Sequence, residues 1–151
     1  MEGTIWLCFL GVVVALWWTI PRLRYARQRI LSRKWPQTTA TIQSVTIGTV
    51  PGGKGGIPGA FVAYIYILDG TRCAGIFAMY GGFSQNDIRS DLNRMAQSLP
   101  GSQVGIRYKP SDINVSLLVD ARDPRFEGLK VSQDPEYLNC MPQAHIADLI
   151  R

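Results

Sequence analysis

The chain has 151 residues, which is enough for one domain of ordinary size and too few for two domains with separate cores. Hydrophobic residues make up 46% of it and charged residues 18%, a composition that excludes a chain that is disordered throughout. Its net charge of +5 is concentrated in residues 22–34, which hold six basic residues and no acid, whereas residues 35–151 hold ten basic and ten acidic residues.

Residues 3–20, GTIWLCFLGVVVALWWTI, carry no charge and would extend about 27 Å as a helix, close to the ~30 Å hydrocarbon core of a bilayer. Trp6 near one end and Trp17 and Trp18 near the other are typical of interfacial anchors. The run lacks the basic residues before it and the small-residue site after it that mark a cleaved signal peptide. The sequence therefore predicts a transmembrane helix over residues 1–21.

A basic juxtamembrane segment, residues 22–34, follows the hydrophobic run. Moving an arginine across a bilayer costs roughly 2.5–3.5 kcal/mol, so the segment favours an outside N-terminus and a main domain on the cytoplasmic side of a cell membrane. Two interpretations stay open: a basic amphipathic helix on anionic headgroups, with Leu23, Ala26 and Ile30 on one face, or a topology signal and linker. The candidate membrane-surface residues are Arg22, Arg24, Arg27, Arg29, Arg33 and Lys34.

The body, residues 35–120, has the pattern of a β domain. Alternating apolar residues separated by turn residues predict strands over residues 38–50, 60–68, 71–80, 103–109 and 115–119. In the first strand the alternation slips between Ile42 and Val45, which indicates a β-bulge. The second is apolar on both faces, which indicates a central strand, and Asp69-Gly70 after it predicts a two-residue hairpin turn.

One helix is expected to cover the sheet, over about residues 84–99, because Ser84 and Asp87 resemble a helix start and apolar residues then recur at helical spacing. Residues 121–151 are predicted to form an irregular tail with one short helix near its end. The expected fold class is α+β: an N-terminal transmembrane helix, then a small, mainly antiparallel β domain, a twisted sheet or barrel of four to six strands, with one covering helix.

A glycine-rich loop, residues 48–59, contains the start of a phosphate-binding motif, G-x-x-x-x-G-K, ending at Lys54. The motif is incomplete, because Gly55 replaces the magnesium-binding Ser or Thr and the loop leads into a predicted strand rather than a helix. Gly53 and Lys54 are the candidate ligand contacts if this loop binds anything; otherwise it is a hairpin loop.

No residues stand out as catalytic or metal-binding. The three cysteines, Cys8, Cys73 and Cys140, form no C-x-x-C pair; the odd count favours a reducing compartment, while pairing of Cys73 with Cys140 stays open for an external body. The only histidine, His145, lies in the predicted tail, and the aspartates occupy helix-start and turn positions. We therefore predict no catalytic residues, no metal and no cofactor.

Several short motifs occur together in order. Trp35-Pro36 follows the hydrophobic run, Ala40-Thr41-Ile42 begins a strand, Tyr64-Ile65-Tyr66 lies in the next, and residues 101–110 contain Val104-Gly105-Ile106-Arg107-Tyr108-Lys109-Pro110, followed by Ser116-Leu117-Leu118. Over residues 35–119 this order resembles the domain-of-unknown-function 3592 family. The resemblance implies a small membrane-anchored β domain with no assigned catalytic activity and no functional residues to carry over.

The predicted function is a membrane-anchored, non-enzymatic interaction or assembly module. Its expected partners are the lipid bilayer and another membrane protein or a second copy of the chain, but no nucleic acid, since no aromatic platform accompanies the basic residues. The alternative is a membrane-tethered domain that binds a small ligand or nucleotide through residues 48–59.

Overall fold

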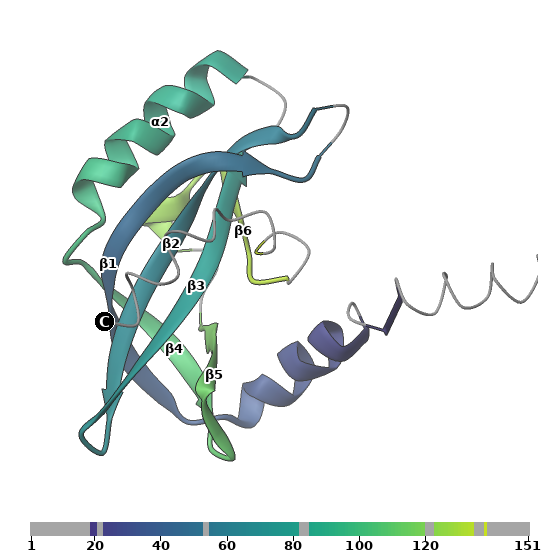
Figure 1. Cartoon of the computed structure of the whole chain (residues 1–151), viewed down its shortest axis with the longest axis vertical. Coiled ribbons are helices and arrows are strands. Elements are labelled where there is room, and N and C mark those ends of the chain that lie inside the picture. Colours follow the sequence, from purple (N-terminus) through teal and green to yellow (C-terminus); the bar gives the residue numbers. More distant parts are fainter. Residues whose placement is uncertain are drawn as a thin grey trace, which may run out of the picture.

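The computed structural model describes residues 19–20, 23–52, 55–81, 85–119, 123–134 and 138, the side chains of 85–87 excepted. Six antiparallel strands form one sheet in the order β5-β4-β1-β2-β3-β6, and the sheet curls into an open half-barrel (Figure 1). The strands are β1 (Gln37–Val50), β2 (Ile57–Leu68), β3 (Thr71–Gly81), β4 (Gln103–Lys109), β5 (Asp112–Leu118) and β6 (Leu129–Ser132).

Strand pairing confirms the predicted local features. The register between β1 and β2 shifts between Ile42 and Ser44, which is the predicted bulge. Asp69 and Gly70 both have positive φ, as a tight hairpin turn requires, and Leu68 pairs with Thr71 across it. β2 lies between β1 and β3 in the sheet, which agrees with a strand that is apolar on both faces.

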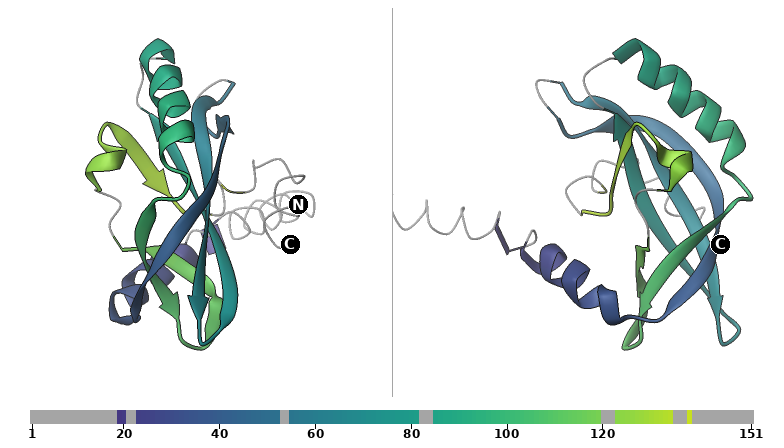
Figure 2. Two further views of the ribbon diagram at one scale, coloured as in Figure 1. Left: turned by 90° about the vertical axis from the view of Figure 1, so that its left-hand side faces the viewer. Right: turned by 180° about the vertical axis from the view of Figure 1, so that it is seen from behind.

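Helix α2 (Gln85–Ser98) packs across one end of the half-barrel and contacts β1 and β2, as two of the views show (Figure 2). It buries Leu92 and Met95, and Leu99 directly after it, in a core with side chains from the inner face of the sheet, among them Tyr64 and Phe77. Leaving these side chains in water would cost about 1.5–3 kcal/mol each, so the predicted apolar spacing is what holds α2 on the sheet.

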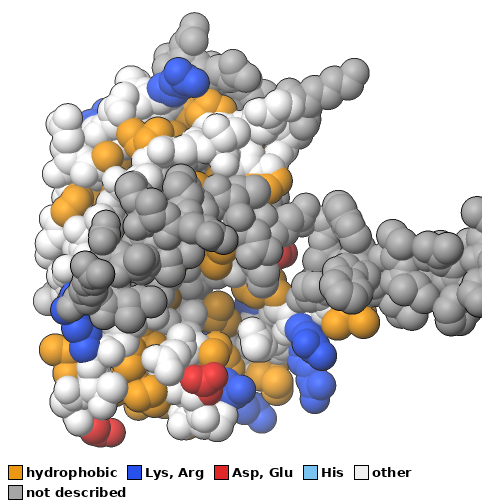
Figure 3. Space-filling view, viewed as in Figure 1, with side chains coloured by type: hydrophobic (Ala, Val, Ile, Leu, Met, Phe, Trp, Pro, Cys, Tyr) orange, Lys and Arg blue, Asp and Glu red, His pale blue; other side chains and the backbone are white. Residues whose placement is uncertain are grey.

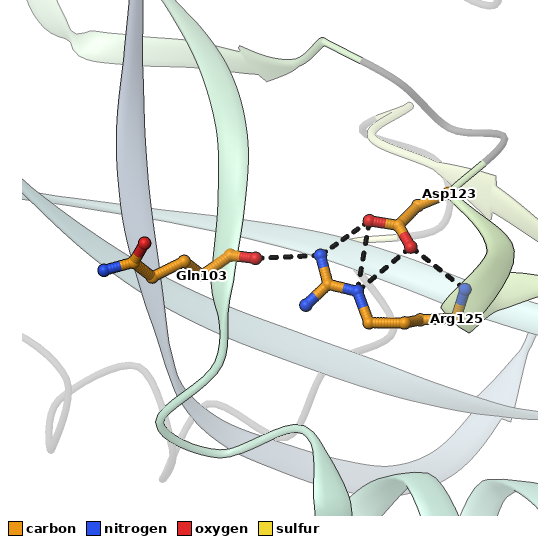
Figure 4. A network of polar contacts seen from close by, with 3 residues as sticks. All are labelled: Gln103, Asp123 and Arg125. Atoms are coloured by element: carbon orange, nitrogen blue, oxygen red, sulfur yellow. Dashed lines mark hydrogen bonds and ion pairs between the residues drawn. The ribbon is translucent and has the colours of Figure 1, made fainter.

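The short helix η2 (Pro124–Phe126) and strand β6 extend the fold beyond residue 120. Phe126 is buried edge-on to Phe77, with ring centroids 5.6 Å apart. Next to it, Arg125 Nη2 donates to Asp123 at 2.6 Å and to the backbone oxygen of Gln103 at 2.8 Å, which ties η2 to the start of β4 (Figure 4). The hydrogen bonds from Arg125 lower the pKa of Asp123.

The predicted fold class is wrong as stated. It expected a transmembrane helix and one covering helix, but within the described ranges there are two helices, α2 and residues 23–31, and neither is long and apolar enough to cross a bilayer. A helix over residues 23–31 was one of the two interpretations left open for the basic segment, but the expected fold class did not include it. Residues 1–18, on which most of the predicted span falls, lie outside the described residues, as do His145 and the predicted short terminal helix.

The prediction of an irregular tail over residues 121–151 also needs correction, because the segment contains a strand. Residues 129–132 pair with β3 between Ala78 and Gly81 and so form a sheet edge inside the segment expected to be irregular. Four residues are too few to show a strand periodicity, which is why the alternation of Leu129 and Val131 did not predict β6.

Candidate functional site

The helix of residues 23–31, named here the basic helix, leads through η1 (Ser32–Lys34) into β1 and lies beside the lower end of the half-barrel in Figure 1. The helix and η1 each make a hydrogen bond with the body, through Tyr25 and Ser32 respectively. The Tyr25 hydroxyl accepts a hydrogen bond from the Gln133 amide at 3.2 Å, and the Ser32 carbonyl accepts one from Arg107 Nη1 at 3.3 Å. Ser32 is buried, and its Oγ donates to the Arg29 carbonyl at 2.8 Å. These contacts fix which side of the helix faces outward.

The outward side of the basic helix combines apolar and cationic side chains. Leu23 is 67% exposed and Leu31 50% exposed, and Arg24 and Arg27 are exposed between them. Residues at spacings of three and four lie on one helical face, so these four side chains form one surface, named here the outer face. Basic side chains gather beside apolar ones over this helix in the space-filling view (Figure 3). Such a surface is typical of helices that lie on anionic membranes.

The inner contact of Tyr25 belongs to a buried polar network centred on Gln133. Gln133 Oε1 accepts from the Leu118 amide at 2.8 Å, and its Nε2 lies 3.1 Å from the Tyr64 hydroxyl and 3.3 Å from the Ser116 carbonyl. The hydroxyls of Tyr64 and Ser116 are 2.9 Å apart. β5 and β3 do not pair directly, and β6 pairs with β3 only from Ala78 to Gly81. Gln133 Nε2 also donates to the Ile76 carbonyl at 3.3 Å, so its side chain joins β5 to the part of β3 that β6 leaves unpaired.

Burial raises the pKa of Tyr64 to about 12, against hydrogen bonds from Ser116 and Gln133 that act in the opposite direction. Tyr66 donates from its hydroxyl to the Ile113 carbonyl on β5, and burial raises its pKa as well. Both tyrosines stay neutral at physiological pH and connect β2 to β5, so their role in the structure is to close the half-barrel. Both side chains belong to the hydrophobic core of the domain.

A groove of about 840 Å³ separates the basic helix and η1 from β4, the end of β5 and Asp134. Three arginines line it: Arg29 and Arg33 from the helical side and Arg107 from β4. Its apolar lining comes from Ala26, Ile30, Leu118 and Val119. The volume falls in the range of small-molecule sites, and the lining is amphipathic. We name this feature the arginine groove.

The arginine groove carries an excess of positive charge. The ion pairs that the structure gives between described residues are Asp91–Arg94 and Asp123–Arg125, and neither involves a groove arginine. Arg107 is half-buried and its Nε is buried without a hydrogen-bond partner in this part of the chain. Asp134 is the one carboxylate that lines the groove. A half-buried guanidinium away from a carboxylate favours an anionic ligand.

Tyr25 lies at the wall of the groove, and the charges of Arg29 and Asp134 affect the pKa of its hydroxyl. Burial raises its pKa, the hydrogen bond from Gln133 and the positive charge of Arg29 lower it, and Asp134 raises it. The tyrosine is therefore a neutral hydrogen-bonding group at physiological pH. It can donate its hydroxyl proton to an anion in the groove while it accepts from Gln133.

The predicted membrane-surface residues separate into two groups. Arg24 and Arg27 lie on the outer face, whereas Arg29 and Arg33 line the arginine groove. Lys34 is exposed in η1, and Arg22 lies outside the described residues.

Gly53 and Lys54, the candidate contacts of the glycine-rich loop, also lie outside the described residues. The strands on either side of the loop stay paired up to Val50 and Ile57, so β2 begins directly after it. The described flank is therefore a β-hairpin and lacks the helix N-terminus that a phosphate-binding loop uses.

Three residues of the site were missed from the sequence: Tyr25, Arg107 and Gln133. Arg107 appeared only inside a strand motif, and Gln133 follows a strand that was not predicted. No local pattern could have found the set, since 108 positions separate Gln133 from Tyr25. That Tyr25 is half-buried on a mostly exposed helix is visible only in three dimensions.

The described residues include neither a metal-binding cluster nor a pair of cysteines. Among the residues that the structure describes, no group of three His, Cys, Asp or Glu side chains could hold a metal ion. Cys73 is buried as a free thiol in β3 and points its sulfur 3.9 Å from the Thr71 carbonyl. Cys8 and Cys140 fall on residues that the structure does not describe, so the pairing alternative for Cys140 stays untested.

Comparison with known proteins adds no relative. The chain matches no family model, no curated protein sequence and no solved structure. The resemblance to the domain-of-unknown-function 3592 family therefore stays a prediction from the sequence, and the site has to be interpreted from its own geometry.

Proposed function

We propose that this chain is a non-enzymatic interaction module located at a membrane, with its body on the cytoplasmic side, and that its outer face binds anionic lipid headgroups. The location rests on the hydrophobic sequence of residues 3–20 and on the basic residues that follow it. The observation that carries the lipid contact is the outer face itself: two exposed leucines and two exposed arginines, turned away from the body by the contacts of Tyr25 and Ser32.

Charge complementarity selects the partner. The segment 22–34 has six basic residues and no acid, while residues 35–151 are balanced. A basic side chain near an anionic bilayer surface gains about 1 kcal/mol, and a partly inserted leucine adds the gain of its buried area. A protein partner with a complementary acidic groove would be a different proposal, and the test below separates the two.

Hydrogen exchange of the full-length chain in lipid nanodiscs tests this proposal. In discs of mixed phosphatidylcholine and phosphatidylserine, the amides of residues 23–31 should exchange more slowly than in discs of phosphatidylcholine alone. High salt should remove the difference, because it screens the surface charge. Loss of two arginines at about 1 kcal/mol each should reduce the added protection about tenfold or more in Arg24→Gln/Arg27→Gln.

The matched control is Arg72→Gln/Arg89→Gln, which makes the same change in net charge at exposed positions on β3 and α2. It should exchange like the unchanged protein. Equal exchange of residues 23–31 in both kinds of disc would refute lipid binding by the outer face. External protease treatment of intact cells tests the location, since digestion of the body would contradict the cytoplasmic side.

The alternative ligand-binding function through residues 48–59 is not proposed here. The described flanks of that loop form a hairpin, and its two candidate contacts lie outside the described residues. The polar network around Gln133 likewise serves the closure of the half-barrel rather than a reaction.

A further inference from the structure

We propose that the arginine groove is a binding site for a phosphate group carried on an apolar body, held by Arg29, Arg33 and Arg107. This inference rests on the proposed function, because it specifies which anion the membrane-facing side of the body recognises. The ligand chemistry is a phosphate ester next to a hydrocarbon chain, which either a bilayer phospholipid or a free phosphate ester could supply.

The first support is the convergence of charge from three segments. Arg29 comes from the basic helix, Arg33 from η1 and Arg107 from β4, and all three line one groove. Arg29 and Arg33 lie four positions apart in one basic run, whereas Arg107 lies 74 positions beyond Arg33, so only the tertiary structure brings it to them. Guanidinium groups present paired donors that match the oxygens of a phosphate.

The second support is the state of Arg107. Its guanidinium is half-buried, its Nη1 makes one long hydrogen bond of 3.3 Å to the Ser32 carbonyl, and its Nε has no partner among the described residues. Partly desolvating a cation without an ion-pair partner is costly. The charge of an anion in the groove would offset that cost, and the hydrogen bond to Ser32 holds the guanidinium at the groove wall.

The third support is the apolar lining on the same groove. Ile30 is 66% exposed beside Ala26 on the helical side, and Leu118 and Val119 lie on the opposite side. A free inorganic anion would leave these side chains in water, whereas the first methylene groups of an acyl chain would cover them. Asp134 also lines the groove and repels an anion, so the local excess is two positive charges rather than three.

The groove is distinct from the outer face. Arg24 and Arg27 lie on an exposed helical surface, whereas the groove has walls on both sides and includes one guanidinium, that of Arg107, held by a hydrogen bond to Ser32. The groove therefore predicts saturable, stoichiometric binding, while the outer face predicts binding that follows the surface potential.

Titration of the full-length chain in non-ionic detergent tests the site without a charged bilayer. The probes are dihexanoylphosphatidic acid, dihexanoylphosphatidylcholine and inorganic phosphate, each followed by calorimetry and by hydrogen exchange of residues 25–34 and 117–119. We expect saturable binding of the phosphatidic acid, at least tenfold weaker in Arg29→Gln/Arg33→Gln. Arg107→Lys keeps the positive charge but loses the paired N–H donors of the guanidinium, so it should weaken binding several-fold. Arg72→Gln/Arg89→Gln should bind like the unchanged chain.

The probes also test the apolar part of the proposal. Binding of the short-chain phosphatidic acid with at least tenfold weaker binding of inorganic phosphate supports a site for a phosphate ester that carries a hydrocarbon chain. Equal affinities for the two probes would mean that the apolar lining contributes nothing, which contradicts the proposal. No saturable binding, or equal weakening in the groove variant and in the control, overturns the proposal. Because this titration uses neutral micelles, its failure is distinguishable from a failure of the outer face in the nanodisc experiment.

Discussion

Gln133 offers the sharpest test of how the half-barrel is closed. Its Oε1 accepts from the Leu118 amide at 2.8 Å, and its Nε2 lies within 3.3 Å of three acceptors: the Tyr64 hydroxyl and the carbonyls of Ile76 and Ser116. An amide nitrogen has two hydrogens, so the three acceptors share them and the side chain contributes about three hydrogen bonds in total. The substitution Gln133→Met keeps the length of the side chain and removes all of them.

The expected loss follows from these contacts. Each hydrogen bond contributes about 0.5–1.5 kcal/mol, and Leu118 is only half-buried, so water replaces part of what is lost. We expect the free energy of unfolding to fall by about 2 kcal/mol, which corresponds to a decrease in Tm of roughly 5–10 °C for a chain of this size. The backbone amide of Leu118 should also exchange faster with solvent, because it loses its acceptor.

Thermal unfolding of the full-length chain in non-ionic detergent, followed by near-ultraviolet circular dichroism, measures this loss. The control is Gln103→Met on β4, where the side chain is exposed and only the backbone oxygen binds Arg125 (Figure 4). Its Tm should stay within about 2 °C of the unchanged chain, as is usual for surface substitutions. A Gln133→Met variant as stable as Gln103→Met would show that the edges of the half-barrel do not depend on this side chain.

Three further predictions concern buried or constrained positions. The pKa of Tyr64 is about 12 in the folded chain against an ordinary value of about 10, so the unfolded chain loses its proton first. The contribution of Tyr64 to stability should be constant below about pH 10 and fall by about 2–3 kcal/mol by pH 12, and Tyr64→Phe should reduce that fall in denaturant titrations at each pH. Gly75→Ala would place a Cβ too close to the Tyr64 ring and should lower the free energy of unfolding by about 1–3 kcal/mol. Ala74→Gly, at the neighbouring position, should lower it by at most about 1 kcal/mol. Equal effects of the two variants would contradict the close approach of Gly75 to Tyr64. Asp69 has a φ of 49°, so Asp69→Val should destabilise the hairpin by about 1–2 kcal/mol while Asp69→Asn leaves it unchanged or slightly more stable, and similar Tm values for the two variants would argue against the left-handed turn.

Local sequence patterns determined much of the body. Alternation placed five strands, the slip between Ile42 and Val45 located the bulge, and Asp69-Gly70 fixed the hairpin. These features follow from contacts between near neighbours and from the backbone preferences of single residues, both of which are present in the sequence itself. The helical spacing of apolar residues placed α2 in the same way.

Only the tertiary structure decided the site. Curvature of the sheet brings β5 near the part of β3 that β6 leaves unpaired, and Gln133, just past the four-residue strand β6, joins them and binds Tyr25. That contact sets which side of the basic helix faces outward and thereby divides its arginines between a surface and a groove with Arg107. The sequence shows how many basic residues the segment has. The side of the helix on which each one points outward depends on packing against residues that are distant along the chain.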